Sequence, residues 1–510
     1  MPTLRTSSVD TPPPDDLRLR PRSDAMVREV ELAPGRFTLD EGPFRYWDRT
    51  IATRADGGTE ETIRYRSAAP HWGWLVDLAT RRPVRRGLAD GSSPVWCPTD
   101  RLTPRDAQVL GLCATLSVVA GFLGGLITQT MTRIADDFGE SLCDQTGSLA
   151  IIRIGAVVTL VAAAAADRIG RRGMLLGSLV GSAIASTLTA IAPSFAAVTV
   201  LQLVSRGLTA AAAVLISIVV VEEIPAHSRA YAIGLMILPG GLGVGMVLWV
   251  LPLADLAPWA WRIIFGLSAL AGLAAWASAR RLPESERFEH DEHVPHERER
   301  QHIDLRRFAL LGLILFLLNL FTAPVQQLQN DYLNQVRGFS ATKTSVFLLL
   351  TNTWGFVGIA VGSQLADRRG RRWAAAIGLL GIAAGNAVMF NTSGWPMWAA
   401  SVVGSVVGAV LAPALGAMLP ELFPTLRRGA ANGWLTCVAV VGSATGLLTT
   451  GAAAGCSATP SYGSAMNLLA LAPVVAVGLA FFLPESAGVE LEALNPDDPE
   501  PDDRPYTSTT

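Results

Sequence analysis

A charged motif occurs twice in this chain, 200 residues apart, and long apolar runs surround both copies. The first copy reads Asp-Arg-Ile-Gly-Arg-Arg from Asp167, and the second reads Asp-Arg-Arg-Gly-Arg-Arg from Asp367. A Glu-x-x-Pro-x-x-x-Arg motif recurs after 199 residues, and a Leu-Pro-Glu-Ser motif recurs after 201 residues. Three pairs at nearly one offset indicate an internal duplication. Because the runs between the motifs are apolar, the duplicated unit is a set of membrane-spanning helices.

Composition agrees with a membrane protein and argues against several classes of chemistry. Hydrophobic residues make up 50% of the 510 residues and charged residues only 16%, against about 25% charged in an average soluble domain. The formal net charge is −2, so no nucleic-acid partner is indicated. Lys343 is the only lysine and follows Thr342, which leaves no Gly-Lys-Ser/Thr loop for ATP. Common hydrolase signatures are missing, and the five cysteines lack metal-ligand spacing, so we expect no enzyme activity, cofactor or bound metal.

Twelve apolar segments of roughly the 20 residues that span a bilayer are predicted after residue 106. They fall at 107–130, 146–166, 173–192, 195–221, 230–252, 258–279, 308–331, 343–366, 373–391, 396–420, 429–452 and 464–483. The predicted fold is an all-α membrane protein with two pseudo-symmetric six-helix bundles, at 105–280 and 308–487. A charged cytoplasmic loop at 281–307 joins the bundles, and the tail at 488–510 is predicted to be disordered.

The predicted N-terminal extension covers residues 1–104 and divides into two parts. Residues 1–36 are rich in Pro, Asp, Arg and Ser and are predicted to be mostly disordered. Residues 37–100 contain aromatic and β-branched runs around an Asp56-Gly57-Gly58 turn signal, which predicts a small β-rich unit. This unit either binds something or is a solvated extension that packs on the membrane part.

Arginine placement predicts the orientation in the membrane. Short loops on the side of the Asp-Arg motifs hold 17 arginines, whereas the opposite loops hold only Arg133, Arg337 and Lys343. Cytoplasmic loops are enriched in Lys and Arg, so the motif side and both chain ends are predicted to be cytoplasmic. The first twenty residues have no apolar core and predict no cleaved secretory signal. We expect a multi-pass protein of the plasma membrane.

The repeated motifs resemble those of the major facilitator superfamily. The stretches 166–172 and 365–372 are similar to the family's loops between helices 2 and 3 and between helices 8 and 9. Glu421 with Arg428, and the Pro-Glu-Ser corners, resemble the sugar porter, organic cation and aromatic acid branches. The resemblance covers about residues 105–487. The chain departs from the pattern in helix 1, which carries no acidic residue, and in the spacing of Arg206 from the following Glu-x-x-Pro motif.

The charged motifs are predicted to act in gating. An Asp beside a tight Gly turn lies near the start of the next helix, whose dipole favours negative charge. Arginines of the motif can bridge to acids on neighbouring helices, and the Glu-x-x-Pro-x-x-x-Arg motifs can form ion pairs that exist in one transport state and break in the other. The alternative is that these arginines only fix topology. The predicted gating residues are Asp167, Arg168, Gly170, Arg171, Arg172, Asp367, Arg368, Gly370, Arg371, Arg372, Glu222, Arg229, Glu421 and Arg428.

Polar and aromatic residues within the apolar segments are candidates for solute binding, because an idle charge at membrane depth is costly. Arg153 is expected to face the central cavity and attract an anionic or carbonyl-bearing solute, with snorkelling or an inter-helix hydrogen bond as the alternative. For the amides and tryptophans, an exterior cap and space filling are the alternatives. The predicted set is Arg153, Arg206, Gln326, Gln327, Asn330, Asn352, Trp354, Asn432 and Trp434.

The resemblance implies a secondary transporter that moves a sugar, an organic acid or a drug-like metabolite by alternating access. Coupling to protons and a monomeric state are part of this expectation, and the partners are the solute and the lipid bilayer. The alternative is a transporter-like sensor or scaffold that signals through the N-terminal extension.

Overall fold

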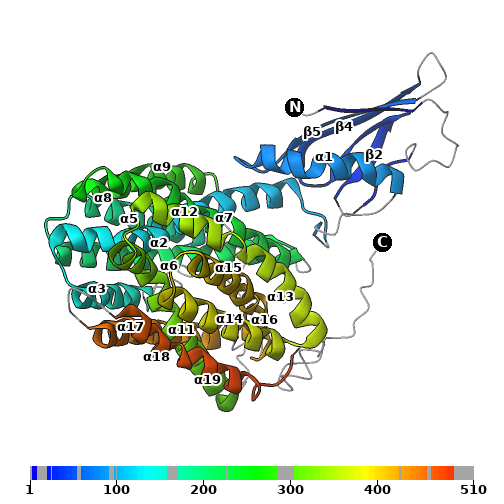
Figure 1. Ribbon diagram of the computed structural model, residues 1–510. Coiled ribbons are helices and arrows are strands. Elements are labelled where there is room, and N and C mark those ends of the chain that lie inside the picture. Colours follow the sequence, from blue (N-terminus) through cyan, green and yellow to red (C-terminus); the bar gives the residue numbers. More distant parts are fainter. Residues whose placement is uncertain are drawn as a thin grey trace.

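The computed structural model describes residues 3–8, 20–24, 26–53, 59–90, 97–98, 100–157, 170–225, 228–283, 304–423, 428–455 and 461–486. Its helices form a bundle, with a small β-sheet and helix α1 (Gly73–Asp90) at one end (Figure 1). We call this end the motif end, because the turns at Gly170 and Gly370 also lie there. The opposite end, where the first bundle helix finishes at Gly139, is called the far end.

The helices of the first half follow the predicted order. They are α2 (Pro104–Phe138), α3 (Leu142–Ile154), α5 (Arg171–Thr189), α6 (Phe195–Glu223), α7 (Arg229–Val250), α8 (Trp261–Gly266) and α9 (Ser268–Ala279). Short 3-10 turns extend them at η2 (Gly155–Val157), η4 (Leu251–Asp255) and η5 (Pro258–Ala260). The predicted segment 146–166 is described only as far as residue 157.

The second half repeats this plan with more breaks in its helices. Its elements are α11 (Leu305–Asp331), the π-helix η7 (Tyr332–Val336), α12 (Ala341–Asn352), α13 (Gly355–Arg369), α14 (Arg371–Asn391), α15 (Trp395–Ala409), α16 (Leu411–Glu421), α17 (Arg428–Ala454), α18 (Tyr462–Leu469) and α19 (Leu471–Ala480). In the described part, ten helical stretches are long and apolar enough to cross a membrane. Every predicted segment overlaps an observed helix, so the predicted membrane fold is confirmed.

Glycines let helices approach closely at equivalent places in the two halves. A Cβ atom at Gly243 of α7 would lie 2.0 Å from the Val118 carbonyl oxygen of α2. A Cβ atom at Gly446 of α17 would lie 2.1 Å from the Leu320 carbonyl oxygen of α11. Small residues permit such contacts between membrane helices, where packing replaces the hydrophobic effect as the driving force. The pairs α2–α7 and α11–α17 thus repeat one packing arrangement in each half.

The extension is an antiparallel sheet with α1 packed on it. Its strands are β1 (Thr3–Ser8), β2 (Arg28–Ala33), β3 (Arg36–Glu41), β4 (Phe44–Thr53) and β5 (Thr59–Ser67), in the spatial order β1-β5-β4-β3-β2. The predicted β-rich character is confirmed, while the Asp56-Gly57-Gly58 turn lies outside the described residues.

The predicted disorder of residues 1–36 is wrong for β1 and β2. These strands pair along β5 and β3. Strand pairing satisfies backbone N–H and C=O groups whatever the side chains are, so short strands can form in a polar segment whose composition alone indicates disorder.

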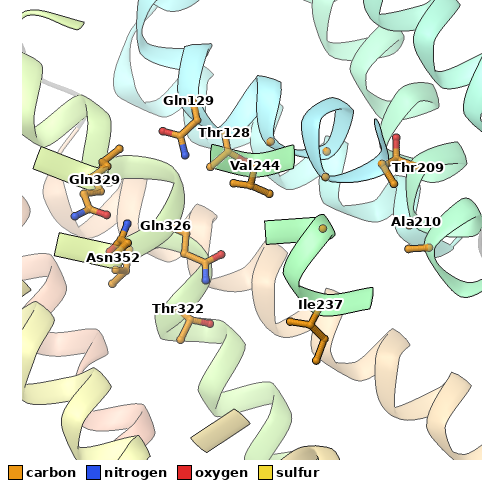
Figure 2. A pocket seen from close by; sticks show the side chains of 18 of the residues that line it. Thr128, Gln129, Thr209, Ala210, Ile237, Val244, Thr322, Gln326, Gln329 and Asn352 are labelled. Carbon is orange, nitrogen blue, oxygen red and sulfur yellow. The ribbon is translucent and has the colours of Figure 1, made fainter. Parts of the chain in front are cut away.

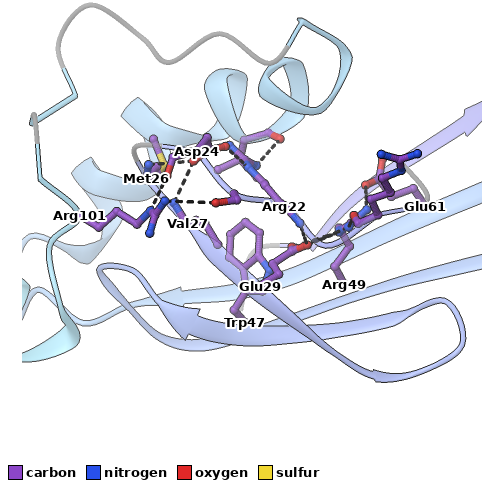
Figure 3. A network of polar contacts seen from close by, with 12 residues as sticks. Arg22, Asp24, Met26, Val27, Glu29, Trp47, Arg49, Glu61 and Arg101 are labelled. Carbon is purple, nitrogen blue, oxygen red and sulfur yellow. Dashed lines mark hydrogen bonds and ion pairs between the residues drawn. The ribbon is translucent and has the colours of Figure 1, made fainter. Parts of the chain in front are cut away.

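A buried ion pair organises the core of the extension (Figure 3). Arg49 Nη2 on β4 lies 2.8 Å from Glu29 Oε2 on β2, and neither side chain is exposed to solvent. Trp47 Nε1 donates to Glu29 Oε1 at 2.7 Å, and the Arg49 guanidinium lies 4.1 Å from the centre of the Phe37 ring. Removing one member of such a pair leaves an uncompensated buried charge, at a cost of about 3–5 kcal/mol. The pair therefore fixes the position of β2 on the sheet.

Polar contacts at the motif end attach the extension to the helices. Arg101, just before α2, donates from Nη1 to Glu41 Oε2 at 2.8 Å and from Nε to the Asp24 carbonyl oxygen at 2.7 Å (Figure 3). The Asp100 N–H donates to Ser228 Oγ, at the start of α7, at 2.9 Å. These contacts hold the extension against α2 and α7.

Candidate functional site

A cavity of about 860 Å³ lies between the two halves of the bundle. It is lined by α2, α3, α6 and α7 of the first half and by α11, α12, α14 and α15 of the second. Small and aliphatic residues such as Gly124, Ile237 and Gly404 form much of the wall. The volume is in the range of sites that take small organic molecules, roughly 300–1,000 Å³. A site between repeats, where both halves can move around it, is what alternating access requires.

Two arginines give this cavity a positive charge. Arg153 of α3 and Arg206 of α6 are the only charged side chains among the described residues that line it. Arg206 Nη1 donates to the Gly124 carbonyl oxygen at 3.2 Å, and Arg153 Nε is buried without a hydrogen-bond partner in the described part of the chain. Neither arginine forms an ion pair with a described acid. Positive charge held at membrane depth without a counter-ion favours an anionic ligand.

Amide and hydroxyl groups complete the polar part of the lining. Figure 2 shows Gln129 and Thr209 of the first half and Gln326, Gln329 and Asn352 of the second half around the same space. Such neutral groups donate and accept hydrogen bonds with the oxygen atoms of a solute. The arrangement suits a small polar molecule that carries an anionic group.

Five of the nine predicted binding residues line the cavity, namely Arg153, Arg206, Gln326, Asn330 and Asn352. The other four do not line it in the described structure. Gln327 is 3% exposed and faces another side of α11, because successive residues of a helix point about 100° apart. Trp354 and Trp434 are surface residues, 52% and 63% exposed, and Asn432 has a buried Oδ1 away from the cavity.

The predicted set leaves out several polar residues of the lining. Gln129, Gln329, Asn386 and Ser405 all face the cavity. Gln329 lies one helical turn after Gln326, so the spacing of three residues was a usable signal. The others are single neutral polar residues within apolar segments, which the sequence does not separate from hydroxyl and amide groups used in helix packing.

Hydrogen bonds between the halves close the far end of the cavity. Asn330 Nδ2 of α11 donates to Gln129 Oε1 of α2 at 2.7 Å. Gln335 Nε2 of η7 donates to Asp136 Oδ1 of α2 at 2.7 Å. Gln129 and Asn330 line the cavity, and Asp136 lies in the last turn of α2, so the two bonds join the halves between the cavity and the far end.

Asp255 of η4 makes a third connection between the halves at the far end. Its carboxylate accepts the backbone N–H groups of Ala341 at 2.8 Å and Thr342 at 2.9 Å, in the first turn of α12. A carboxylate at a helix N-terminus satisfies free N–H groups and interacts favourably with the helix dipole. The first half therefore caps a helix of the second half.

At the motif end of the second half, the charged motif forms a compact cluster. Gly370 has φ +103°, a conformation that favours glycine. The next residue, Arg371, forms an ion pair with Glu421 of α16, and its N–H donates to Glu485 Oε1 at 2.8 Å. Arg372 lies 3.8 Å from Glu485 Oε2. Glu485, from the Leu-Pro-Glu-Ser motif, thus stabilises the N-terminus of α14.

The first half has a corresponding arrangement. Gly170 has φ +97°, Arg171 Nη2 lies 2.9 Å from Glu222 Oε1 of α6, and Arg172 Nη2 donates to the Arg280 carbonyl oxygen at 2.7 Å. These ion pairs join helices of the same half. Arg368 is exposed in the last turn of α13. Of the other predicted gating residues, Asp167 and Arg168 lie outside the described residues, and the side chains of Asp367, Arg229 and Arg428 are not described.

The fold and this cavity define a membrane transporter with two homologous halves. Comparison with known proteins identifies the family to which it belongs. The profile of the Major Facilitator Superfamily matches residues 113–366 and 328–501. The chain belongs to this superfamily.

Solved structures of transporters share the fold at low sequence identity. A D-xylose-proton symporter superposes with a TM-score of 0.64 at 17% identity, covering 74% of this chain and 98% of that one. The inward open xylose transporter XylE from E. coli gives 0.61 at 16% identity, covering 76% and 99%. The nucleoside transporter NupG gives 0.60 at 13% identity, covering 73% and 98%. At these identities the likeness shows the fold alone.

Proposed function

We propose that this protein is a secondary active transporter that carries a small organic anion through the central cavity. The observation that carries the proposal is the pair Arg153 and Arg206, which have no acid beside them among the described lining residues. A guanidinium at membrane depth costs roughly 2.5–3.5 kcal/mol on insertion scales, so two of them facing one cavity indicate a bound counter-charge. The planar guanidinium fork matches a carboxylate, and the amides of α11 and α12 can bind its remaining oxygens.

The state described here is closed at the far end. In this proposal the motif end is in the cytoplasm, as the arginine distribution predicts, and the protein is a plasma-membrane monomer in a state that is shut toward the outside. Breaking the Asn330–Gln129 contact and the Asp255 cap would open the far end. The ion pairs of the motif end keep each half rigid while the halves rock.

The proposal includes coupling to protons, because the transported solute carries a negative charge. Moving one anion inward against a potential of 100 mV costs about 2.3 kcal/mol, and one accompanying proton cancels that charge. Asp331, next to the lining residue Asn330, is a buried carboxyl that can carry the proton; Asp136 of α2 is a second acid within electrostatic reach. Asp331→Asn should abolish the stimulation of uptake by an inward proton gradient while leaving solute exchange. Full stimulation in this variant would exclude Asp331.

Ligand binding to the purified protein tests the anion site. A thermal-shift screen with organic acids, sugars and organic cations should show stabilisation by an organic acid. Arg153→Lys should weaken that stabilisation, because lysine lacks the planar fork, and Arg153→Ala should remove it. Arg262→Lys is the matched control, since Arg262 stacks on Trp261 and donates to the Ala192 carbonyl oxygen away from the cavity. Stabilisation only by sugars, or unchanged in both Arg153 variants, would refute the anion site.

A sensor or scaffold is the second candidate, and the firm attachment of the extension favours it. The extension contacts α2 and the start of α7, and both helices also line the cavity. Solute bound in the cavity could therefore shift the extension. Solute flux in proteoliposomes distinguishes the two: a transporter exchanges labelled solute across the bilayer, whereas a sensor binds it without flux.

A further inference from the structure

The start of α1 lies at the depth of the lipid bilayer. Trp72 Nε1 donates to Thr115 Oγ1 of α2 at 3.0 Å, and a Cβ atom at Gly111 would lie 2.8 Å from Pro70. Thr115 is about 16 Å along α2 from its first residue. The 35 residues of α2 span about 52 Å, which exceeds the hydrocarbon core of about 30 Å by roughly 10 Å at each end. Trp72 and the first turn of α1 therefore meet the lipid of the adjacent leaflet.

This part of α1 exposes large apolar side chains. Trp74 is 67% exposed, Leu75 42% and Leu78 65%. Arg81 and Arg82 follow and are exposed too, about 10 Å further along the helix. Trp74, Leu78 and Arg81 are spaced to share one face. Exposed apolar residues in the first turns of a helix, which we call the apolar tip, are here followed one to two turns later by arginines. This pattern is typical of a segment that is inserted into a leaflet as far as the lipid headgroups.

An apolar cavity of about 550 Å³ lies behind this tip, between α1, α2 and α7. It is lined mainly by hydrocarbon side chains, including Met26, Leu75, Val76, Leu110, Leu235 and Leu238. It is separate from the central cavity, which is lined by Ile237 and Gly240 on another face of α7. Leu238 is 69% exposed, so the lining continues into the lipid-facing surface of α7. An apolar site reached from the bilayer fits a hydrocarbon chain and not a polar metabolite.

We propose that this cavity binds one anionic phospholipid of the adjacent leaflet. An acyl chain fills the space between α1, α2 and α7, and the phosphate group lies on Arg81 and Arg82. One guanidinium group can donate hydrogen bonds to two phosphate oxygens at once, so arginine is well suited to this contact. The acid nearest along the helix, Asp77, is half-buried with a buried Oδ1, and among the described residues it forms no ion pair with Arg81 or Arg82. Because the site contacts α7, a bound lipid would link membrane composition to the wall of the central cavity.

Native mass spectrometry of the full chain, delipidated and incubated with phosphatidylglycerol or phosphatidylcholine, tests the proposal. The parent should retain one phosphatidylglycerol and little phosphatidylcholine. The double variant Arg81→Glu and Arg82→Glu should lower phosphatidylglycerol occupancy at least tenfold. Ala79→Phe, at an exposed position that lines the apolar cavity, should do the same by filling the space for the chain.

The matched control is the double variant Arg45→Glu and Arg64→Glu, which reverses two exposed arginines on β4 and β5. It should retain phosphatidylglycerol as the parent does. Unchanged occupancy in either test variant, equal retention of phosphatidylcholine by the parent, or an equal loss in the control would overturn the proposal. Gel filtration of every variant confirms that each is folded before its occupancy is compared.

Discussion

Replacing Gly370 by alanine should lower the free energy of unfolding by more than backbone strain alone explains. Gly370 has φ +103° and ψ +150°, a region almost restricted to glycine, and holding a side chain there costs about 1–3 kcal/mol. The added Cβ would also lie 2.6 Å from Glu485 Oε2, so Glu485 must move away from the N–H of Arg371. A hydrogen bond to a charged group contributes about 1.5–3 kcal/mol, and we take the lower limit because Glu485 is one-third exposed. The expected loss in the free energy of unfolding is about 2.5–4.5 kcal/mol.

Gly394→Ala is the matched control for strain alone. Gly394 has φ +60° and ψ −140° at the start of α15, and no atom lies within 4 Å of an added Cβ. Its expected loss is about 1–3 kcal/mol. The assay is reversible unfolding by SDS in mixed micelles, repeated for Gly370→Ala in a Glu485→Gln background. In that background the alanine should cost less, because the contact is already weakened. Equal losses for the two glycines, together with full additivity in the double variant, would show that the contact with Glu485 adds nothing to the strain.

Three further outcomes follow from the described contacts. Glu222→Gln removes the ion pair with Arg171 and should slow solute exchange in proteoliposomes several-fold without loss of insertion; unchanged exchange would make the pair structural only. Asp255→Asn weakens the cap on α12 and should raise labelling of a cysteine at Thr128 by an impermeant thiol reagent from the far side; unchanged labelling would contradict the closed far end. Burial raises the pKa of the Cys97 thiol to about 11, so alkylation should be slow at pH 8 and accelerate about tenfold per pH unit toward 11. A rate at pH 8 equal to that of the denatured chain would contradict the burial of Cys97.

The sequence was most informative for residues whose chemical type does not fit the segment around them. Arg153 and Arg206 stand out because charge within an apolar segment is expensive, and the duplicated glycine motifs stand out because only glycine adopts the turn at Gly370 readily. The sequence failed where the outcome depends on which way a helix faces. Trp354 lies in the break between α12 and α13, so its direction is set by tertiary packing, which the periodicity of the sequence does not contain.

The extension shows a second limit of sequence reasoning. The strand β1 and its partner β5 are separated by some fifty residues, and such non-local pairing leaves no compositional trace in a segment rich in proline, aspartate, arginine and serine. Helix α1 was not predicted, because its interior Pro83 and its polar second half resemble a loop. The exposed apolar side chains at its start are explained by the position of this helix beside α2 and the proposed contact with the bilayer.

Anion transport through the central cavity is tested most directly by the flux of a carboxylic acid and of its neutral amide into proteoliposomes that contain the purified protein. The two solutes have nearly the same size and shape, so the difference between them isolates the charge that Arg153 and Arg206 are proposed to bind. For an acid identified by the thermal-shift screen, we expect saturable uptake of the carboxylate, accelerated by an inward proton gradient, and little uptake of the amide. Equal uptake of both solutes, or uptake of the amide alone, would contradict the central claim.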